Sequence, residues 1–282
     1  MSETYKRNIE TLSNFKHYGV HGVETLKNIE INNKFRIVDG KNGHKCIEYT
    51  EGSKSININS CYDPVREGEK WLKGLDIGED LTIIFGFGAG YHLIDLDKIL
   101  DKDSKVLIIE PSIECFKCAL YINDFTKIFT NDNVFLYIAN DVSNLKYILY
   151  GLIQEGVYPD IKIAEFIPVE RVHRQFFNDV RREILEFLNN VVLNLNTIQF
   201  FSKMWTENFF RNLVYTIKSP GISKLFNRFH KMPLIIISAG PSLDKNIELL
   251  KDAKGKAVLL CVGTALKALL KKGIEPDLVI SI

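Results

Sequence analysis

The sequence predicts an α/β protein in which a Rossmann-like parallel-sheet domain and the start of a second one are joined by helices. Three observations support this fold class. Short runs rich in aliphatic residues, such as LTIIF at 81–85 and KVLII at 105–109, alternate with helical segments, a pattern typical of parallel strands covered on both faces. The same alternation returns after residue 229. Between the two regions the apolar spacing changes to the 3.6-residue period of a helix.

Residues 1–75 are expected to contain an extended lead-in and then a small antiparallel β region. The short alternating runs FRIV, KCIEY and SININ follow one another here. They are separated by the dipeptides Asp39-Gly40 and Asn42-Gly43, which tolerate positive φ and therefore favour hairpin turns. The segment SCYDPVREGEKWLKGL then predicts a helix that its Asp-Pro pair opens.

Residues 76–167 are predicted to form the N-terminal Rossmann-like domain. The order is a strand in LTIIFGF, a helix in YHLIDLDKIL, a strand in KVLIIEP, a helix in SIECFKCALYI and a strand in NVFLYIA. A further strand is expected between Asp160 and Ile167. Because the first strands are apolar throughout, we expect both faces of this sheet to be buried.

Residues 168–228 are predicted to be a helical linker. Apolar residues recur at four-residue steps along its first part, at Val172, Phe176, Val180, Ile184 and Leu188. This is the spacing of one helix face. The aromatic-rich stretch IQFFSKMWTENFFRNLVY continues the helix, and the SPG tripeptide ends it.

Residues 229–282 are predicted to begin a nucleotide-binding domain. PLIIISA and KAVLLCV are strands separated by a helix, TALKALLKK is a second helix, and DLVISI begins a third strand. Since the chain stops within that strand, we expect the domain to be incomplete and the chain to be part of a longer protein.

The composition indicates a globular protein without a general affinity for nucleic acid. Hydrophobic residues make up 46% and charged residues 25% of the 282 residues, and 36 Lys and Arg against 35 Asp and Glu leave a net charge of +1. This balance argues against a nucleic-acid partner. No apolar run reaches the roughly 18 residues of a membrane span. The charged start MSETYKRNIE lacks the apolar segment of a signal peptide, so we expect a cytoplasmic protein.

The first glycine-rich loop, GFGAGYH, follows a buried strand. Gly86, Gly88 and Gly90 let the backbone turn sharply and approach a ligand, and a following helix would offer N–H groups to an anion. Glu110 ends the next strand, where an acidic side chain can accept hydrogen bonds from a ribose. The bulky tyrosine in the loop departs from the dinucleotide pattern GxGxxG. These four residues are candidates for a second ligand loop, with a purely structural turn as the alternative.

The second loop, SAGPSLD, also follows an apolar strand, and its Gly240, Pro241, Ser242 and Leu243 are the candidate nucleotide-binding residues. The glycine permits close approach, and the proline fixes φ at the entry to a helix. The serine suits either an N-cap or a phosphate contact, and the helix dipole adds partial positive charge. Asp244 argues the other way, because a carboxylate repels a phosphate unless a metal such as Mg²⁺ intervenes. A well-capped helix without a ligand is the alternative.

Gly263 and Thr264 follow the next strand of this region. If the two strands are neighbours, both residues lie beside the second loop, because parallel strands end at the same edge of a sheet. Thr264 is expected as a helix N-cap, with a nucleotide contact as the alternative.

No metal site is predicted. Cys115 and Cys118 form a lone CxxC with no second ligand pair, and a structural zinc needs four ligands. Among the six histidines only His17 and His21 approach a ligand spacing, and their segment is not a clear helix.

Several segments together resemble the bacterial motility-associated factors. They are SCYDPVREGEKW, FGFGAGYHL, VLIIEPSIECFKCAL and above all the block from PLIIISAGPSLDK to PDLVISI. This family consists of glycosyltransferases that attach nonulosonic (sialic-acid-like) sugars to flagellin. The last block is also similar to the core of archaeal 6-hydroxymethylpterin diphosphokinases, and its GPSL loop to the cytidine-nucleotide loop of bacterial sialyltransferases. The resemblance implies a Rossmann-like central domain whose nucleotide lies at Gly240 to Leu243.

The resemblance further implies a parent protein that moves a nonulosonic sugar from a CMP-sugar to Ser or Thr of flagellin. Its partners would be flagellin or flagellar assembly proteins. Because the family's domain continues past the third strand, the chain by itself is expected to be catalytically incomplete, and no catalytic residue is assigned. The alternatives are pyrophosphoryl transfer from ATP to a pterin, which requires Mg²⁺, and a non-catalytic docking module.

Overall fold

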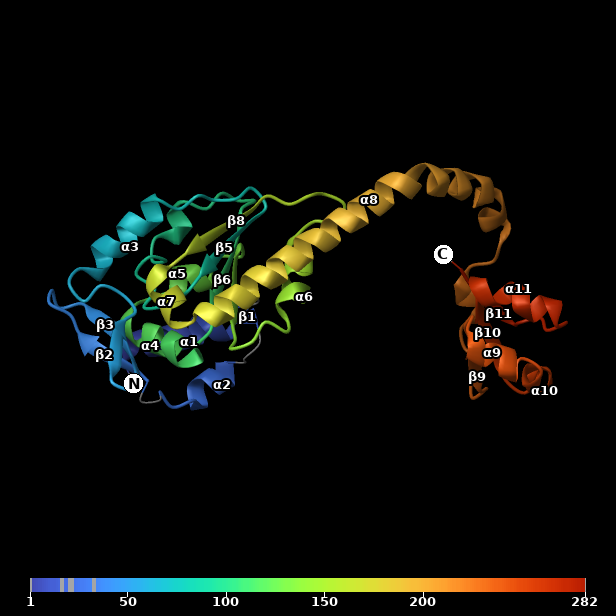
Figure 1. Ribbon diagram of the computed structural model, residues 1–282, viewed down its shortest axis with the longest axis horizontal. Helices are drawn as coiled ribbons and strands as arrows, with labels where there is room; N and C mark the ends of the chain where they lie inside the picture. The colour runs from blue at the N-terminus through green and yellow to red at the C-terminus, as the bar shows by residue number, and fades with distance from the viewer. Residues whose placement is uncertain (1, 16–17, 20–22, 32–33, 282) are drawn as a thin grey trace. The chain divides into compact units, whose positions relative to one another are not determined.

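The computed structural model describes residues 2–15, 18–19, 23–31 and 34–281. Contacts within the chain divide it into two compact units, residues 1–202 and 203–282. The division falls inside helix α8 (Arg174–Lys218), which is yellow to orange in Figure 1. None of the helices in the described ranges combines the length and apolarity that a bilayer span needs.

A five-stranded parallel sheet forms the centre of the first unit. In spatial order its strands are β1 (Tyr18–Gly19), β7 (Val134–Ile138), β6 (Lys105–Glu110), β5 (Leu81–Phe85) and β8 (Ile161–Glu165). All four neighbouring pairs are parallel. The predicted α/β class with a parallel sheet is therefore confirmed. The strand order reverses its direction between β5 and β8, which is the place where open α/β sheets commonly bind a ligand.

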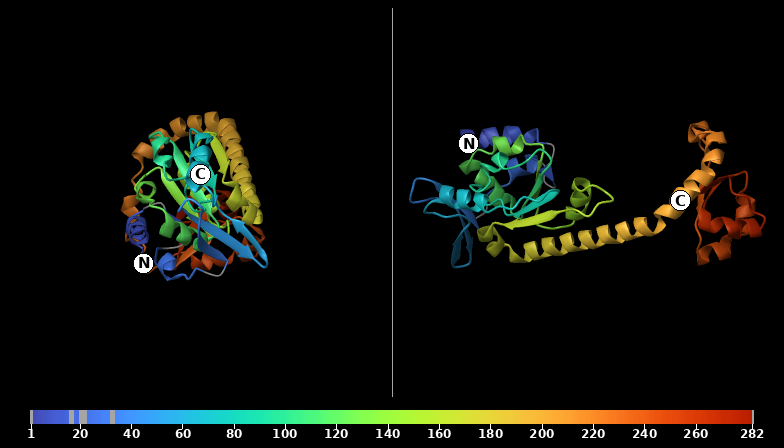
Figure 2. Two further views of the ribbon diagram at one scale, coloured as in Figure 1. Left: turned by 90° about the vertical axis from the view of Figure 1, so that its left-hand side faces the viewer. Right: turned by 90° about the horizontal axis from the view of Figure 1, so that it is seen from above.

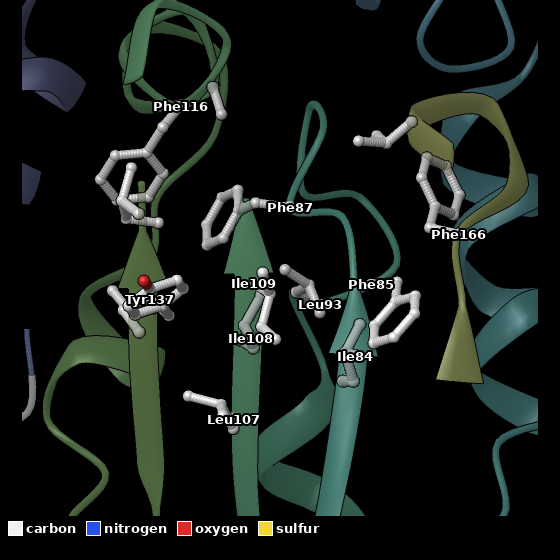
Figure 3. Close-up of a cluster of buried hydrophobic side chains, with 14 of the residues drawn as sticks. Ile84, Phe85, Phe87, Leu93, Leu107, Ile108, Ile109, Phe116, Tyr137 and Phe166 are labelled. Atoms are coloured by element: carbon white, nitrogen blue, oxygen red, sulfur yellow. The ribbon is translucent and has the colours of Figure 1, made fainter. Parts of the chain in front are cut away.

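Helices and aromatic side chains enclose this sheet. The helices are α4 (Ile113–Ile122), α5 (Thr126–Phe129), α6 (Leu145–Leu152), α7 (Ile167–Val172) and the first part of α8. Figure 3 shows Phe87 beyond the end of β5, pointing toward Phe116 of α4. Their rings meet edge to face with centroids 4.8 Å apart, and Phe85 stacks on Phe177 of α8 at the same separation. Such aromatic pairs add to the free energy of apolar burial.

The N-terminal segment belongs to the core of the first unit and is not an extended lead-in. Helices α1 (Glu3–Ser13) and α2 (Val23–Asn28) lie here, and α1 contacts α4 and α5 (Figure 1). The side chain of Asn8 is fully buried; its amide group donates to the carbonyl oxygens of Leu120 and Asn123, and its oxygen accepts from the Phe125 amide. The amphipathic spacing of Tyr5, Ile9 and Leu12 explains why the segment folds onto the sheet unit.

The predicted antiparallel region is confirmed. Strands β2 (Phe35–Asp39), β3 (Lys45–Glu51) and β4 (Lys54–Asn57) pair antiparallel and are the blue strands at one end of the first unit in Figure 2. The second turn lies at Gly52, where φ is +61°, and not at a predicted dipeptide. Helix α3 (Pro64–Lys73) begins where the Asp-Pro pair predicts, and the Asp63 carboxylate accepts from the Arg66 amide.

The helix predicted in YHLIDLDKIL is wrong. Turns occupy residues 91–95, and only a short 3₁₀ helix, η1 (Leu96–Lys98), follows. The hydrogen bonds from the Leu93 amide to the Gly90 carbonyl and from the Leu96 amide to the Leu93 carbonyl span three residues, so no α-helical ladder develops. This difference matters for the site, because the segment that directly follows the first glycine loop is not an α-helix.

The second unit contains a three-stranded parallel sheet. Its elements are η2 (Ile222–Leu225), β9 (Leu234–Ile237), α9 (Pro241–Asn246), α10 (Leu249–Ala253), β10 (Val258–Val262), α11 (Gly263–Lys271) and β11 (Leu278–Ile280). The spatial order is β11-β10-β9. Because successive strands are added in one direction and such crossovers are right-handed, the helices cover one face. On that face Ile237, Leu259 and Cys261 pack with Leu250 and Leu269 of the helices.

The other face of the second sheet exposes apolar side chains. Ile236 of β9 is 67% exposed and Ile280 of β11 is 58% exposed. Their paired partners on the central strand, Leu260 and Val262, are only partly buried. Parallel sheets normally have both faces covered, so within the described residues this sheet presents an uncovered face.

Candidate functional site

The first glycine loop is filled by protein side chains. Gly86, Gly88 and Gly90 have φ values of +99°, +51° and +77°, a region that favours glycine. A Cβ atom at Gly86 would lie 2.7 Å from Cβ of Val169, and one at Gly90 would lie 2.3 Å from Cζ of Phe125. The glycines are therefore needed for close packing at the point where the strand order reverses.

Glu110 occupies the amide groups that an anion would otherwise bind. Its Oε2 accepts from the amides of Phe87 and Gly88, each at 2.9 Å, and its Oε1 accepts from the Ser112 amide at 3.1 Å. The amide of Gly86 donates to the Ile109 carbonyl, and the amide of Gly90 donates to the Phe87 carbonyl. The predicted ribose-binding carboxylate thus lies inside the loop and holds it, with no exposed surface of its own.

Burial shifts the ionisation of two groups beside this loop. Desolvation raises the pKa of Glu110 to about 7, although its three amide donors act in the opposite direction. Desolvation lowers the pKa of His92 to about 3, and its Nε2 lies 3.1 Å from the Gly86 carbonyl oxygen. The His92 ring stacks on Phe166, with centroids 3.9 Å apart, and Trp71 meets it edge to face. Both pKa shifts arise from burial in the protein core. Because side chains fill the loop and its amides are occupied, the geometry does not support a ligand here.

The second loop is open. Gly240 has a φ of 178°, which is extended backbone, and a Cβ atom there would meet nothing within 4 Å. The side chains of Ser238 and Ser242 are exposed. Pro241 is the first residue of α9, as the sequence predicts. Space for a ligand therefore exists directly beside the backbone at Gly240.

The amides of this loop are mostly available. The Leu243 amide donates to the Gly240 carbonyl oxygen at 2.9 Å. Among the described residues, the amides of Gly240 and Ser242 have no hydrogen-bond partner. Neither Ser242 nor Asp244 caps the helix, because Gly240 holds the N-cap position and no side chain bonds to the first turn. The Ser242 hydroxyl and the amides of Gly240 and Ser242 can therefore form hydrogen bonds with a ligand.

Strand pairing brings Gly263 and Thr264 to the same sheet edge as the second loop. Ile237, which ends β9, pairs with Cys261 of β10, so the residues after both strands emerge at one edge. Helix α11 begins at Gly263 with Val262 as its N-cap, so Thr264 is not the N-cap that the sequence predicts but an exposed residue of the first turn. The candidate residues are neighbours by topology.

Ser281 is a residue of this edge that sequence reasoning missed. A Cβ atom at Gly263 would lie 2.8 Å from Oγ of Ser281, which follows β11. The signal was available, because a polar residue directly after a third parallel strand belongs to the same edge. Gly263 therefore leaves room for a hydroxyl-bearing residue of the adjoining strand.

Two hollows adjoin this edge, and they are separate. One of about 330 Å³ is lined by Ser238, Ser242, Leu243 and Asn246, together with β9 and Leu250. A shallower one of about 480 Å³ is lined by Gly263 and side chains of α11, among them Lys267 and Lys271. Both lysines belong to α11, whose first residue is Gly263.

Within the described ranges, no group of three or more His, Cys, Asp or Glu side chains is arranged to hold a metal ion. The weak pair His17 and His21 lies outside the described residues. Cys115 and Cys118 are both buried on α4 as reduced thiols. Asp244 is exposed and stands in the second loop without a carboxylate cluster around it.

Comparisons with known proteins match a different family model to each of the two units. Residues 47–156 match the family model of the glycosyltransferase Maf N-terminal domain, and residues 207–282 match that of 6-hydroxymethylpterin diphosphokinase MptE-like proteins. An uncharacterized protein of Treponema pallidum (strain Nichols) is 22% identical over 171 residues, which are 61% of this chain and 57% of that protein.

Among solved structures, a MAf glycosyltransferase from Magnetospirillum magneticum AMB-1 matches 98% of this chain and 49% of its own, with 14% identity and a TM-score of 0.48. The chain thus spans little more than half the length of the curated relative and about half that of the solved structure. The two family matches agree with the sequence resemblance: residues 47–156 are similar to the glycosyltransferase Maf N-terminal domain, and residues 207–282 are similar to MptE-like proteins.

Proposed function

We propose that the chain is part of a glycosyltransferase that moves a nonulosonic sugar from a CMP-sugar donor to Ser or Thr of flagellin. The donor's nucleotide lies at the carboxyl edge of the sheet of the second unit. The observation that carries this proposal is the open loop at Gly240, where two amides and the Ser242 hydroxyl have no competing partner. Backbone amides arranged in this way suit a phosphate oxygen.

The nucleotide contacts are assigned to six residues. Gly240, Pro241, Ser242 and Leu243 border the phosphate, and Gly263 and Thr264 border the same edge from the next strand. Because helix α9 has only six residues, its dipole is a minor contribution beside the hydrogen bonds.

Transfer from an activated sugar requires little covalent chemistry from these residues. The CMP leaving group is already stable, so positioning of the donor and stabilisation of the departing phosphate lower the barrier. The amides at Gly240 and the hydroxyls of Ser242 and Thr264 perform those two tasks in this proposal. The general base and the acceptor pocket are assigned to no described residue.

Isothermal titration calorimetry with CMP and CDP tests the proposal. We expect binding by the chain and at least a tenfold loss of affinity in Gly240→Asp, because a carboxylate placed in open space beside the phosphate repels it. Gly151→Asp is the matched control: its Cβ atom also meets nothing within 4 Å, but it lies on α6 of the first unit. Absence of heat with every cytidine nucleotide, or equal losses in both variants, would contradict the assignment.

A second candidate is pyrophosphoryl transfer from ATP to a pterin alcohol, which the MptE-like match over residues 207–282 favours. That reaction requires Mg²⁺, and the described residues form no carboxylate cluster for it. The same titrations with ATP, Mg²⁺ and 6-hydroxymethylpterin separate the candidates. Binding of ATP together with the pterin, and none of cytidine nucleotides, would select the second function.

For the first unit we propose protein docking, with flagellin or a flagellar assembly protein as partner and the cytoplasm as location. The support is indirect: the glycine loop of this unit is filled and its amides are occupied. A pull-down of flagellin by residues 1–202, compared with the whole chain, tests this role. Retention only by the whole chain would assign docking to the second unit instead.

A further inference from the structure

Two cysteines of the first unit, Cys46 and Cys61, are neighbours in the fold. Cys46 is a buried residue of β3. Cys61 lies fifteen residues after Cys46, in the segment between β4 and α3, and is half-buried. Both thiols are reduced, and the Cys46 sulfur and the Cys61 carbonyl oxygen lie beside the same glycine, Gly40. The Cys46 Sγ also lies 3.5 Å from the Ser60 carbonyl oxygen. The backbone next to Cys61 therefore contacts the Cys46 side chain directly.

The surrounding backbone holds this arrangement. The Lys41 amide donates to the Cys61 carbonyl oxygen at 2.8 Å, and the Gly40 amide donates to the His44 carbonyl oxygen at 2.7 Å. A Cβ atom at Gly40 would lie 2.9 Å from the Cys61 carbonyl oxygen and 3.2 Å from the Cys46 sulfur. The turn before β3 and the segment after β4 thus enclose the two side chains, with glycine leaving the space for them.

The other cysteines are arranged differently. Cys115 and Cys118 occupy the CxxC motif, but both are buried in the core of the first unit, with at most 1% exposure. Cys261 is a single buried thiol of the second unit. An oxidant in solvent reaches neither site, whereas the half-buried Cys61 is accessible.

We propose that Cys46 and Cys61 form a reversible disulfide when the protein meets a peroxide. The Cys61 thiolate attacks one peroxide oxygen, the O–O bond breaks, and a sulfenic acid forms at Cys61 as hydroxide leaves and takes up a proton. The Cys46 sulfur then attacks the Cys61 sulfur, the S–O bond breaks, and the departing hydroxide takes the Cys46 proton. In sum two thiols lose two electrons and two protons, and hydrogen peroxide becomes two waters.

The order of the two steps follows from burial. Desolvation and the contact with Cys61 raise the pKa of the Cys46 thiol to about 12, so Cys46 is a poor first nucleophile. The product ties β3 to the segment that leads into α3. Since this link constrains the unfolded chain, the oxidised protein unfolds at a higher temperature than the reduced protein.

Differential alkylation with mass spectrometry tests the proposal. The whole chain is treated with hydrogen peroxide, the remaining thiols are alkylated, and the digest is analysed before and after dithiothreitol. We expect a peptide pair linked through Cys46 and Cys61 that dithiothreitol releases, and a Tm that rises on oxidation. Cys61→Ser should abolish both changes, and Cys115→Ser, a matched control on α4, should leave both in place.

Two outcomes would overturn the disulfide. In one, both thiols remain alkylatable after peroxide treatment or Cys61 proceeds to sulfinic acid without a linked peptide. In the other, the linked peptides involve a different cysteine pair. Because Cys61 is half-buried and lies in a connection, Cys61→Ser keeps the test informative even where Cys46→Ser fails to fold.

Discussion

Two glycine loops follow two apolar parallel strands in this chain, and their backbones have opposite uses. In the loop of the first unit, the amides of Phe87 and Gly88 bind the Glu110 carboxylate, and side chains fill the space beside the glycines. In the loop of the second unit, the amides of Gly240 and Ser242 have no partner among the described residues, and the space is open. A strand followed by a glycine-rich turn is therefore ambiguous until the occupant of its amides is known.

The comparison also explains the shape of each loop. Glycine at residue 90 permits a positive φ and avoids a clash, whereas glycine at residue 240 does neither, since its φ is extended and nothing lies close. Replacing Gly90 should therefore destabilise the fold, whereas replacing Gly240 should leave stability almost unchanged. Mutations therefore separate the two uses.

The largest effect is expected for Gly90→Ala. The added Cβ would lie 2.3 Å from Cζ of the buried Phe125 ring, and the alanine would have to keep a φ of +77°. Overpacking and backbone strain together should therefore reduce the free energy of unfolding by about 4 kcal/mol. Gly240→Ala is the matched variant and should change it by less than about 0.5 kcal/mol. Urea unfolding of both variants measures the difference, and similar losses would remove the distinction between the loops.

The next effect is a pH dependence that Glu110 imposes. Burial raises its pKa from 4.5 in the unfolded chain to about 7 in the fold. The folded state thus holds a proton that the unfolded state has released, so this contribution to stability is complete below pH 4.5 and is lost as pH rises through 7. The loss amounts to roughly 3 kcal/mol.

Glu110→Gln isolates this contribution. The amide side chain cannot ionise, so the difference in free energy of unfolding between the native chain and the variant should change between pH 5 and pH 8. Burial lowers the pKa of His92 to about 3, so protonation of the unfolded chain reduces the stability of the fold as pH falls below 6.5. Because the native chain and the variant both contain His92, this contribution cancels in the difference between them. Urea unfolding at four pH values gives the difference curve, and a flat curve would show that the carboxylate is not desolvated.

The smallest effect is expected for Thr264→Val in the second unit. Its side chain is exposed on the first turn of α11, so stability should not change, whereas the loss of one hydroxyl contact should weaken cytidine nucleotide binding about three- to tenfold. Calorimetry with CMP measures this. Unchanged affinity would limit the nucleotide site to the Gly240 loop.

Much of the fold follows from sequence patterns. The strands β5, β6, β7 and β9 are short runs of mostly apolar residues, and the Asp-Pro pair places the start of α3. The helix expected after Gly90 was wrong because Leu93 and Leu96 are fully buried in a segment of tight turns. Periodicity alone does not distinguish such a segment from a short helix.

The candidate sites divide in the same way. Spacing identified both loops, but it could not show that Glu110 turns inward to its neighbouring amides, since this depends on the packing of Val169 and Phe125 from distant segments. The proximity of Cys46 and Cys61 was hidden for the same reason, because it arises from the pairing of β3 with β4. The CxxC motif, in contrast, is conspicuous in sequence and buried in the fold.

The uncovered face of the second sheet has a practical consequence for handling the protein. Leu234, Ile236 and Ile280 are each more than half exposed. A preparation of residues 203–282 alone should therefore adsorb to hydrophobic resins and bind fluorescent dyes that detect exposed apolar surface. Mild detergent or lower concentration during purification should improve its recovery, and the choice of buffer will then matter more for this piece than for the first unit.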